Sequence, residues 1–304
     1  KWYSATISNC FTIYYNRLMI TKFKDIIDAF NRGQTRYTTY RKVPTQTTVT
    51  GVWYDLSMSP GNPIPQYYAA TPMIGIPLRQ STDWWIFHWG DVSPMKKYLH
   101  RTSLQCNSTV PQWAFLLCDY LYFYPFIDEW ITDEQFFDNT NPVTRYVDWW
   151  WVNIMAVSVA ARTWWARFQV KYTNQDWIEG RITPIHITSN ATSNGSLITT
   201  QVTWATNWNR TSPFLTLQEW DTWVRKIESV TMLDADVWLF TLVLVKPIIE
   251  TCLVWVDAPV EVEYFKDRKL LPQIETDAFL NFIMMPTWSW LWYTLLCDFT
   301  FIFN

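Results

Sequence analysis

Residues 166–177, ARFQVKYTNQDW, carry the clearest β-strand pattern of the chain. Phe168, Val170 and Tyr172 alternate with polar side chains, which is the period-2 pattern of a strand with one buried face. Residues 174–177 are rich in turn-forming side chains and predict a tight turn directly after the strand. This stretch therefore favours antiparallel hairpins over alternating strands and helices.

Similar stretches follow one another after residue 106. They are short, rich in β-branched and aromatic residues, and bounded by turn residues. Residues 237–245 are almost continuously apolar, which predicts a central strand. We expect an all-β fold with an antiparallel β-sandwich or jelly-roll-like body. The expected strands are residues 114–123, 152–160, 166–173, 197–203, 224–233, 237–245, 252–257, 260–264, 278–284 and 294–303.

One short helix is predicted near the N-terminus, over residues 22–32. Thr21 is a plausible N-cap and Gly33 a natural stop. The apolar stripe of this helix needs a surface to pack on, either the body of its own chain or a neighbouring subunit. It is the one candidate site, an assembly helix, that the sequence offers. The stripe consists of Phe23, Ile26, Ile27 and Phe30.

The composition then shifts to Thr, Tyr and Pro between residues 35 and 105. Repeated prolines interrupt long helices and central strands, so this segment is expected to be an extended arm with short strands. The arm either wraps a partner or packs on its own domain. The expected organisation is a non-native or disordered leader over residues 1–18, a helix and arm over 19–105, and a β-sandwich domain over 106–304.

Charge and hydropathy restrict the partners. The chain is 49% hydrophobic and 17% charged, so it has the composition of a folded protein. Its net charge of -3 gives no general electrostatic reason to bind nucleic acid or an anionic membrane. No stretch provides the ~20 continuous apolar residues of a membrane span. We therefore expect neither a membrane nor direct nucleic-acid binding.

No motif specifies an enzyme. The phosphate loop, the nucleophile elbow and the zincin pair of histidines are all missing from the sequence, so no catalytic residue, cofactor or metal is expected. His88 near Asp91 is either half of a metal site or part of a turn. A run of acidic residues offers either paired carboxylates for glycoside cleavage or a solvated loop. The run consists of Asp128, Glu129, Asp133, Glu134 and Asp138.

Tryptophan is far more frequent, and glycine far rarer, than in an ordinary chain of this length. The chain has 22 Trp and 7 Gly, where ~21 Gly would be usual. Many of the tryptophans follow Asp, Asn or Thr between strand-like runs, where a turn usually needs glycine. One hypothesis is that they stand where the functional protein has glycine, as when a UGA codon meant as Gly is translated as Trp. The alternative is a truly Trp-rich protein whose rings stack on sugars or bases. The contexts are residues 82–85, 88–91, 148–151, 163–165, 175–177, 207–209, 219–223 and 287–290.

Several stretches, read with Gly at the suspect Trp positions, carry a family resemblance. They occur in order between about Met19 and Asn304 and are residues 118–128 (CDYLYFYPFID), 132–135 (TDEQ), 138–140 (DNT), 170–176 (VKYTNQD), 221–231 (DTWVRKIESVT), 243–247 (VLVKP) and 277–283 (DAFLNFI). Together they resemble a family of largely uncharacterised virion structural proteins of tailed bacteriophages. The family brings no catalytic residues to transfer, and the tryptophans and the stretch before Met19 depart from it.

The resemblance implies a structural subunit of a phage particle, head-associated or a decoration protein. Such a subunit acts by assembly with copies of itself and other virion proteins, and it is put together in the host cytoplasm. The alternative function is a carbohydrate-binding or glycoside-cleaving β domain that uses the acidic run and real Trp rings.

Overall fold

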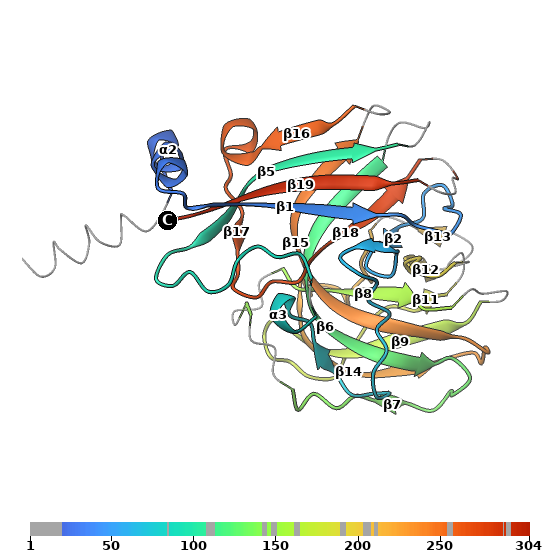
Figure 1. Cartoon of the computed structure of the whole chain (residues 1–304). Helices are drawn as coiled ribbons and strands as arrows, with labels where there is room; N and C mark the ends of the chain where they lie inside the picture. The colour runs from blue at the N-terminus through green and yellow to red at the C-terminus, as the bar shows by residue number, and fades with distance from the viewer. Residues whose placement is uncertain are drawn as a thin grey trace, which may run out of the picture.

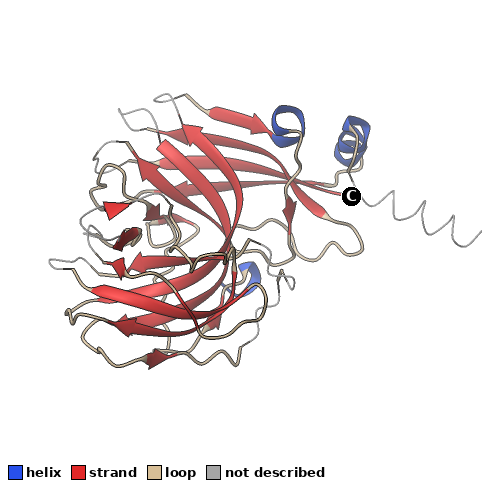
Figure 2. Ribbon diagram, turned by 180° about the vertical axis from the view of Figure 1, so that it is seen from behind, coloured by secondary structure: helices blue, strands red, loops and turns tan. Residues whose placement is uncertain are grey.

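The computed structural model consists mainly of three antiparallel β-sheets (Figure 1). Every pairing between its named strands runs antiparallel. The few helices lie outside the sheets, as Figure 2 shows. The expected all-β, sandwich-like fold is therefore confirmed. The structure describes residues 20–83, 85–107, 113–141, 145–146, 151–160, 165–188, 193–202, 208–209, 212–253, 258–287, 289 and 293–304.

Sheet I joins strands from distant parts of the sequence. Its strands are β1 (Thr35–Lys42), β3 (Gly61–Asn62), β5 (Lys97–Cys106), β16 (Val260–Glu263), β17 (Gln273–Ile274) and β19 (Leu295–Phe303). Their order is β16-β5-β19-β1-β3, with β17 beside β5. The strand β19 therefore lies between β1 and β5, more than 180 residues away from either along the chain (Figure 1).

Sheet II contains the two longest strands. Its strands are β2 (Tyr54–Asp55), β4 (Ile76–Pro77), β6 (Trp113–Asp128), β8 (Asn153–Ser158), β15 (Leu239–Leu253) and β18 (Leu280–Pro286). Their order is β2-β18-β6-β15-β8, with β4 beside β6. The expected central strand is confirmed, because β15 pairs with β6 on one side and β8 on the other. It runs further than predicted, to Leu253.

Sheet III holds the stretch with the clearest sequence pattern. Its strands are β7 (Gln135–Phe136), β9 (Arg167–Asn174), β10 (Arg181–Ile182), β11 (His186–Ile187), β12 (Thr200–Val202), β13 (Trp208–Asn209) and β14 (Val224–Met232). Their order is β13-β12-β11-β9-β14-β7, with β10 beside β9. The predicted turn forms after β9, where the Trp177 N–H donates to the Asn174 carbonyl at 3.2 Å.

Sheet II lies between the other two sheets. Along β15, Val243 and Val245 belong to a buried cluster with residues of sheet I, whereas Leu242 and Leu244 belong to a cluster with residues of sheet III. Successive side chains of a strand point to opposite faces, so both faces of β15 are covered. This explains why its sequence is continuously apolar instead of alternating.

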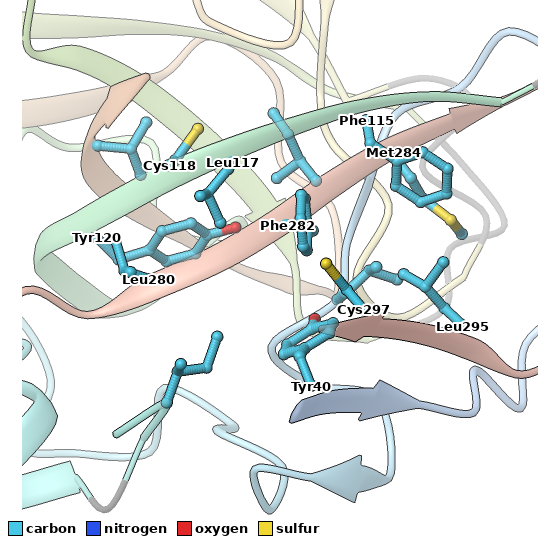
Figure 3. Packing of buried hydrophobic residues seen from close by; sticks show 14 of the residues in the cluster. Tyr40, Phe115, Leu117, Cys118, Tyr120, Leu280, Phe282, Met284, Leu295 and Cys297 are labelled. Carbon is cyan, nitrogen blue, oxygen red and sulfur yellow. The ribbon is translucent and has the colours of Figure 1, made fainter. Parts of the chain in front are cut away.

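Aromatic side chains fill the layer between sheets I and II. Figure 3 shows Tyr40 and Cys297 of sheet I opposite Phe282 and Tyr120 of sheet II. The rings of Tyr40 and Phe282 are 5.6 Å apart and nearly perpendicular, an arrangement that aromatic pairs favour. The Tyr40 hydroxyl donates to the Asn281 side chain at 2.9 Å, so the buried phenol keeps a polar partner.

The predicted N-terminal helix is confirmed as α2 (Phe23–Asn31). Its N-cap is Lys22 and not Thr21, because the Asp25 carboxylate turns back and accepts the backbone N–H groups of both residues at 2.9 Å. Gly33, with φ of 69°, ends the helix as expected. Two shorter helices are α3 (Gln80–Asp83) and the π-helix η1 (Tyr264–Arg268). None of the helices in the described ranges has the length and apolar character that crossing a membrane requires.

The Pro-rich segment, residues 35–105, packs on its own chain. It contributes β1, β3 and β5 to sheet I and β2 and β4 to sheet II. Several of its large side chains, among them Tyr54, Leu56 and Tyr68, belong to the core between these sheets. The expected boundary after residue 105 falls inside β5. Of the two alternatives for this segment, the structure shows the one in which it covers its own body.

Candidate functional site

The first candidate site is the exposed side of α2. Phe23, Ile27 and Phe30 are 55%, 46% and 37% exposed, and their spacing of four and three residues places them on one side of the helix. Ile26, the fourth residue of the predicted stripe, is only 3% exposed. The structure thus divides the stripe into a buried edge and an exposed surface. We call the exposed residues Phe23, Ile27 and Phe30 the α2 face.

Sheet I holds α2 in position. Ile26 packs in a small apolar cluster with Tyr98 of β5 and Ile302 of β19. The Phe30 ring stands edge-on to the His100 ring, with centroids 5.4 Å apart. Both strands are inner strands of sheet I. Their contacts hold one side of α2 on the body, while the α2 face stays exposed.

The second candidate site is a group of tryptophans at one end of sheet III. We call Trp151, Trp177, Trp220 and Trp223 the tryptophan cluster. Trp151 precedes β8, Trp177 lies in the turn after β9, and the other two precede β14. The rings of Trp151 and Trp223 are 5.7 Å apart. The side chain of Gln175 links the turn after β9 to the segment before β14. Its amide nitrogen donates to the Trp220 carbonyl, and its amide oxygen accepts the N–H of Thr222.

Left-handed backbone marks three members of this cluster. Trp151, Trp177 and Trp220 have φ of 66°, 62° and 75°, and Trp89 elsewhere has 79°. This region is costly for side chains with a Cβ and is usually occupied by glycine. The same three rings are 63%, 66% and 86% exposed, so little burial offsets the cost. At these positions the backbone adopts a φ angle that usually requires glycine, and the side chain is as exposed as in a surface turn.

Other tryptophans belong to the core. Trp85, which the turn-like context of residues 82–85 placed among the suspects, is buried and stacks on Phe279 with centroids 4.3 Å apart. Its indole N–H donates to the Leu280 carbonyl at 2.6 Å. Trp113 is also buried and contacts the Tyr293 ring. Neither has a positive φ, so the backbone gives no reason for glycine at position 85. Of these contexts, residues 84, 148–150, 163–164, 207, 288 and 290 lie outside the described residues.

Arginine and aspartate side chains surround the tryptophan cluster. The Arg225 guanidinium lies 4.1 Å from the centroid of the Trp177 ring, a cation–π contact. Nearby, Asp221 accepts hydrogen bonds from Arg181 at 2.8 Å and from Tyr172 at 2.6 Å. Burial alone would raise the pKa of Asp221, but these bonds and one from Asn174 lower it. The end of sheet III thus combines exposed rings with charges that are already paired.

Most side chains of the acidic run make local contacts. Asp128 and Asp138 each accept the backbone N–H of the residue two positions later, at 2.9 and 2.8 Å. Glu134 accepts the hydroxyl of Ser229 on β14, and Glu129 is buried. These bonds fix loops and the short pairing of β7 with β14. The geometry gives Asp128, Glu134 and Asp138 roles in local structure.

His88 makes a different contact from the one considered in the sequence. Its Nε2 lies 2.8 Å from the Ala278 carbonyl and its Nδ1 lies 2.9 Å from Lys97 Nζ. Burial lowers the pKa of His88 to about 3, so the neutral ring donates to the carbonyl and accepts from the lysine. Asp91 accepts the N–H of Ser93 instead. Throughout the described part of the chain, no group of three or more His, Cys, Asp or Glu side chains is arranged to hold a metal ion.

A buried polar network lies between sheets I and II. The Asp55 carboxylate accepts hydrogen bonds from the hydroxyls of Tyr68 and Tyr120, both at 2.7 Å, and from the Asn281 amide at 2.9 Å. Burial raises the pKa of Asp55 in spite of these donors. No local pattern in the sequence signals this network, because its members come from separate segments. It satisfies buried groups and so contributes to a single, well-defined packing.

A small cavity of about 220 Å³ adjoins this network. Its lining includes Tyr54, Tyr67, Met284 and Tyr293. Asp55 also lines it, but both carboxylate oxygens already accept hydrogen bonds from the protein. The lining also includes the polar residues Thr45, Gln46, Thr48, Ser59 and Asn194, so the cavity offers a ligand polar contacts as well as aromatic and aliphatic ones. No family model, curated protein or solved structure matches this chain.

Proposed function

We propose that the protein is a structural subunit of a tailed-bacteriophage virion, head-associated or a decoration protein, that acts by assembly with copies of itself and other virion proteins. The observation that carries this proposal is the α2 face. Three large apolar side chains stay exposed on a helix whose other side packs on the body through Ile26. A protein that acts by assembly needs such a surface, because burying it on association supplies the main driving force.

The rest of the structure supports assembly more than catalysis. The acidic run is tied into loops, His88 is neutral and enclosed, and the buried carboxylate of Asp55 is fully hydrogen-bonded. A body built of three packed antiparallel sheets suits a coat or decoration subunit, and it agrees with the family resemblance of the sequence.

The test is sedimentation of the purified chain over a hundredfold concentration range, with electron microscopy of the fractions. We expect regular oligomers that grow with concentration. Ile27→Asp, which places a charge on the α2 face, should shift the distribution to monomers. Val237→Asp is the matched control, because Val237 is also exposed but lies in the turn before β15. A chain that stays monomeric at every concentration would contradict the proposal.

We also propose that Trp89, Trp151, Trp177 and Trp220 occupy positions that are glycine in the functional protein, as UGA recoding would produce. The support is their positive φ, together with the shortage of glycine in the chain. Peptide mass spectrometry of the protein isolated from its natural source decides this, since Trp and Gly residues differ greatly in mass. Trp in peptides that cover residues 151, 177 and 220 would contradict it.

One observation favours the second candidate, a carbohydrate-binding domain. If the tryptophans are genuine, the tryptophan cluster presents several exposed rings at one end of sheet III, as a sugar-stacking surface does. Titration with soluble polysaccharides, followed by tryptophan fluorescence, separates the two functions. A saturable response that Trp177→Ala and Trp220→Ala abolish would support sugar binding and count against an assembly role.

A further inference from the structure

We propose that the cavity beside Asp55 binds a neutral aromatic group of one or two rings that carries a single polar atom, as indole and phenols do. The cavity shares no residue with the α2 face, so this site does not depend on the proposed assembly function. The size of the cavity, the charge of its lining and the arrangement of its apolar and polar side chains all favour such a ligand.

The volume of the cavity limits the size of the ligand. An apolar protein cavity of ~150 Å³ takes up benzene, a single ring. The cavity beside Asp55, at about 220 Å³, is roughly half again as large and has room for a fused pair of rings such as indole. A sugar ring is of similar size, so the chemistry of the lining has to distinguish the two.

The inner part of the cavity is apolar and aromatic. The Tyr54 hydroxyl accepts the Val49 N–H at 2.7 Å, and the Tyr293 hydroxyl donates to the Met284 sulfur at 3.3 Å. Both hydroxyls thus have protein partners, and these residues offer a ligand ring surface and a thioether, which aromatic rings contact favourably. Most of the buried lining side chains are of this apolar or aromatic kind. They are Pro44, Tyr54, Leu56, Met58, Met284 and Tyr293.

The lining offers no free charge to hold an ionic ligand. Among the described residues that form it, Asp55 is the one acidic side chain and none is Lys, Arg or His. Both carboxylate oxygens of Asp55 are already hydrogen-bonded. An anion would meet this carboxylate, and a cation would have to displace its donors, so a neutral ligand is favoured. The donors belong to Ser57, Tyr68, Tyr120 and Asn281.

Exposed side chains form the rim. Thr45, Gln46 and Asn194 line the cavity, are exposed, and can each donate and accept a hydrogen bond. Tyr67, which is 57% exposed, adds a ring at the entrance. A ligand with its rings inside and one N–H or O–H toward the rim keeps its polar atom paired. A sugar would bring several hydroxyls against the apolar inner part, where unpaired polar groups are costly.

Calorimetric titration of the purified full chain with indole tests the site. We expect saturable binding with a Kd of ~0.1–1 mM, as suits a ligand of this size. Cyclohexanol lacks the aromatic ring, indole-3-acetate adds a charge and methyl glucoside replaces the ring by hydroxyls. Each should bind at least ~10-fold more weakly than indole.

A second titration distinguishes a free molecule from a side chain of another protein, since both carry the same ring. N-acetyltryptophanamide presents the indole ring on a peptide unit. Saturable binding of either compound supports the site. Tighter binding of indole identifies a free molecule as the ligand, and tighter binding of N-acetyltryptophanamide identifies an aromatic side chain.

Two variants locate the bound ring. Tyr67→Ala removes the exposed ring from the rim, and it should weaken indole binding by ~2-fold to 10-fold. Ile64→Ala is its matched control, because Ile64 is also exposed but does not line the cavity. Met284→Leu removes the sulfur at nearly constant volume and should have an effect of similar size. Met155→Leu is its control, because Met155 is equally buried and lies outside the lining.

The site is supported if Tyr67→Ala and Met284→Leu weaken indole binding while both controls bind as the unmodified chain does. Circular dichroism and thermal melting check that all variants are folded. Absence of indole binding up to its solubility limit would overturn the proposal, as would tighter binding of methyl glucoside than of indole. Equal weakening in the controls would place the bound ring elsewhere and would also overturn it. Sedimentation measures assembly separately, so failure of this site leaves the assembly function standing.

Discussion

The side chains of Asp119 and Arg145 form a buried two-pronged ion pair. Arg145 Nε lies 3.0 Å from Oδ2 of Asp119, and Nη2 lies 2.9 Å from Oδ1. Arg145 also donates to the Tyr120 carbonyl, and Asp119 accepts the N–H of Phe279. The pair thus ties the segment at residue 145 to β6 and to the residue that precedes β18, across the middle of the molecule.

Removing one partner of this ion pair should destabilise the folded protein. Arg145→Met leaves the carboxylate of Asp119 buried without a counter-charge, and we expect the free energy of unfolding to fall by ~3–5 kcal/mol. Urea denaturation measures it. The double variant Asp119→Asn/Arg145→Met removes both charges and should be the less destabilised of the two. Glu261→Gln is the control, because its pair with Arg101 is largely exposed and should contribute only ~0–1 kcal/mol.

Trp220→Gly should stabilise the protein. The left-handed backbone of Trp220 costs roughly 1–2 kcal/mol for a residue with a Cβ, and its ring is almost fully exposed. Glycine removes that cost but gives the unfolded chain more freedom, so we expect a net gain of ~0.5–1 kcal/mol in thermal or urea unfolding.

Two variants show whether the gain comes from the backbone. Trp220→Ala removes the ring but keeps a Cβ, so it should bring no comparable gain. Trp113→Gly empties a core position and should cost ~3–5 kcal/mol. Equal stabilisation by Ala and Gly at residue 220 would show that the ring, and not the backbone angle, is unfavourable.

Local pattern predicted the strands whose pairing partners are close in sequence or whose faces are both buried. Residues 166–173 and 237–245 became β9 and β15, since alternation and continuous apolarity report directly on burial. By contrast, β5 carries Arg101, Thr102 and Ser103 in its middle, so its pattern does not show a strand that lies between β16 and β19. Only pairing with these distant strands determines its place.

The helix that carries the first candidate site was predicted in outline. Helical spacing placed four apolar residues of α2 in one stripe, but spacing alone cannot tell which edge of a stripe meets the body. That depends on Tyr98 and Ile302, which β5 and β19 bring under Ile26. The convergence of Trp151, Trp177 and Trp220 was not predictable, because three separate loops meet there.

His88 should make the protein sensitive to acid. In the folded state burial and the nearby Lys97 lower its pKa to about 3, whereas in the unfolded chain it is about 6.5. Between these values the unfolded state binds the additional proton, so stability is lost as the pH falls from about 6.5 toward 3. His88→Gln cannot bind this proton. The difference between the variant and the unmodified protein in unfolding free energy should therefore shift in favour of the variant as the pH is lowered from 7 to 4.

This comparison isolates His88 from other acid-sensitive groups. Asp221 and Asp234 have lowered pKa values and also lose stabilising interactions in acid, but they are the same in both proteins. If the difference in unfolding free energy between the two proteins stays constant from pH 7 to pH 4, His88 binds a proton as readily in the folded state as in the unfolded chain.

Neighbouring residues of α2 should separate stability from association. Ile26→Ala removes a buried side chain from the cluster with Tyr98 and Ile302, and it should cost ~2–4 kcal/mol of unfolding free energy. Ile27→Ala changes an exposed residue and should stay within about 0.5 kcal/mol. If the α2 face contacts a second copy, sedimentation should show the reverse order, with dimers lost by Ile27→Ala at protein concentrations where both variants are folded. Equal loss of stability in the two variants would mean that both sides of α2 are covered by the chain itself, and the face would then not be free to bind a partner.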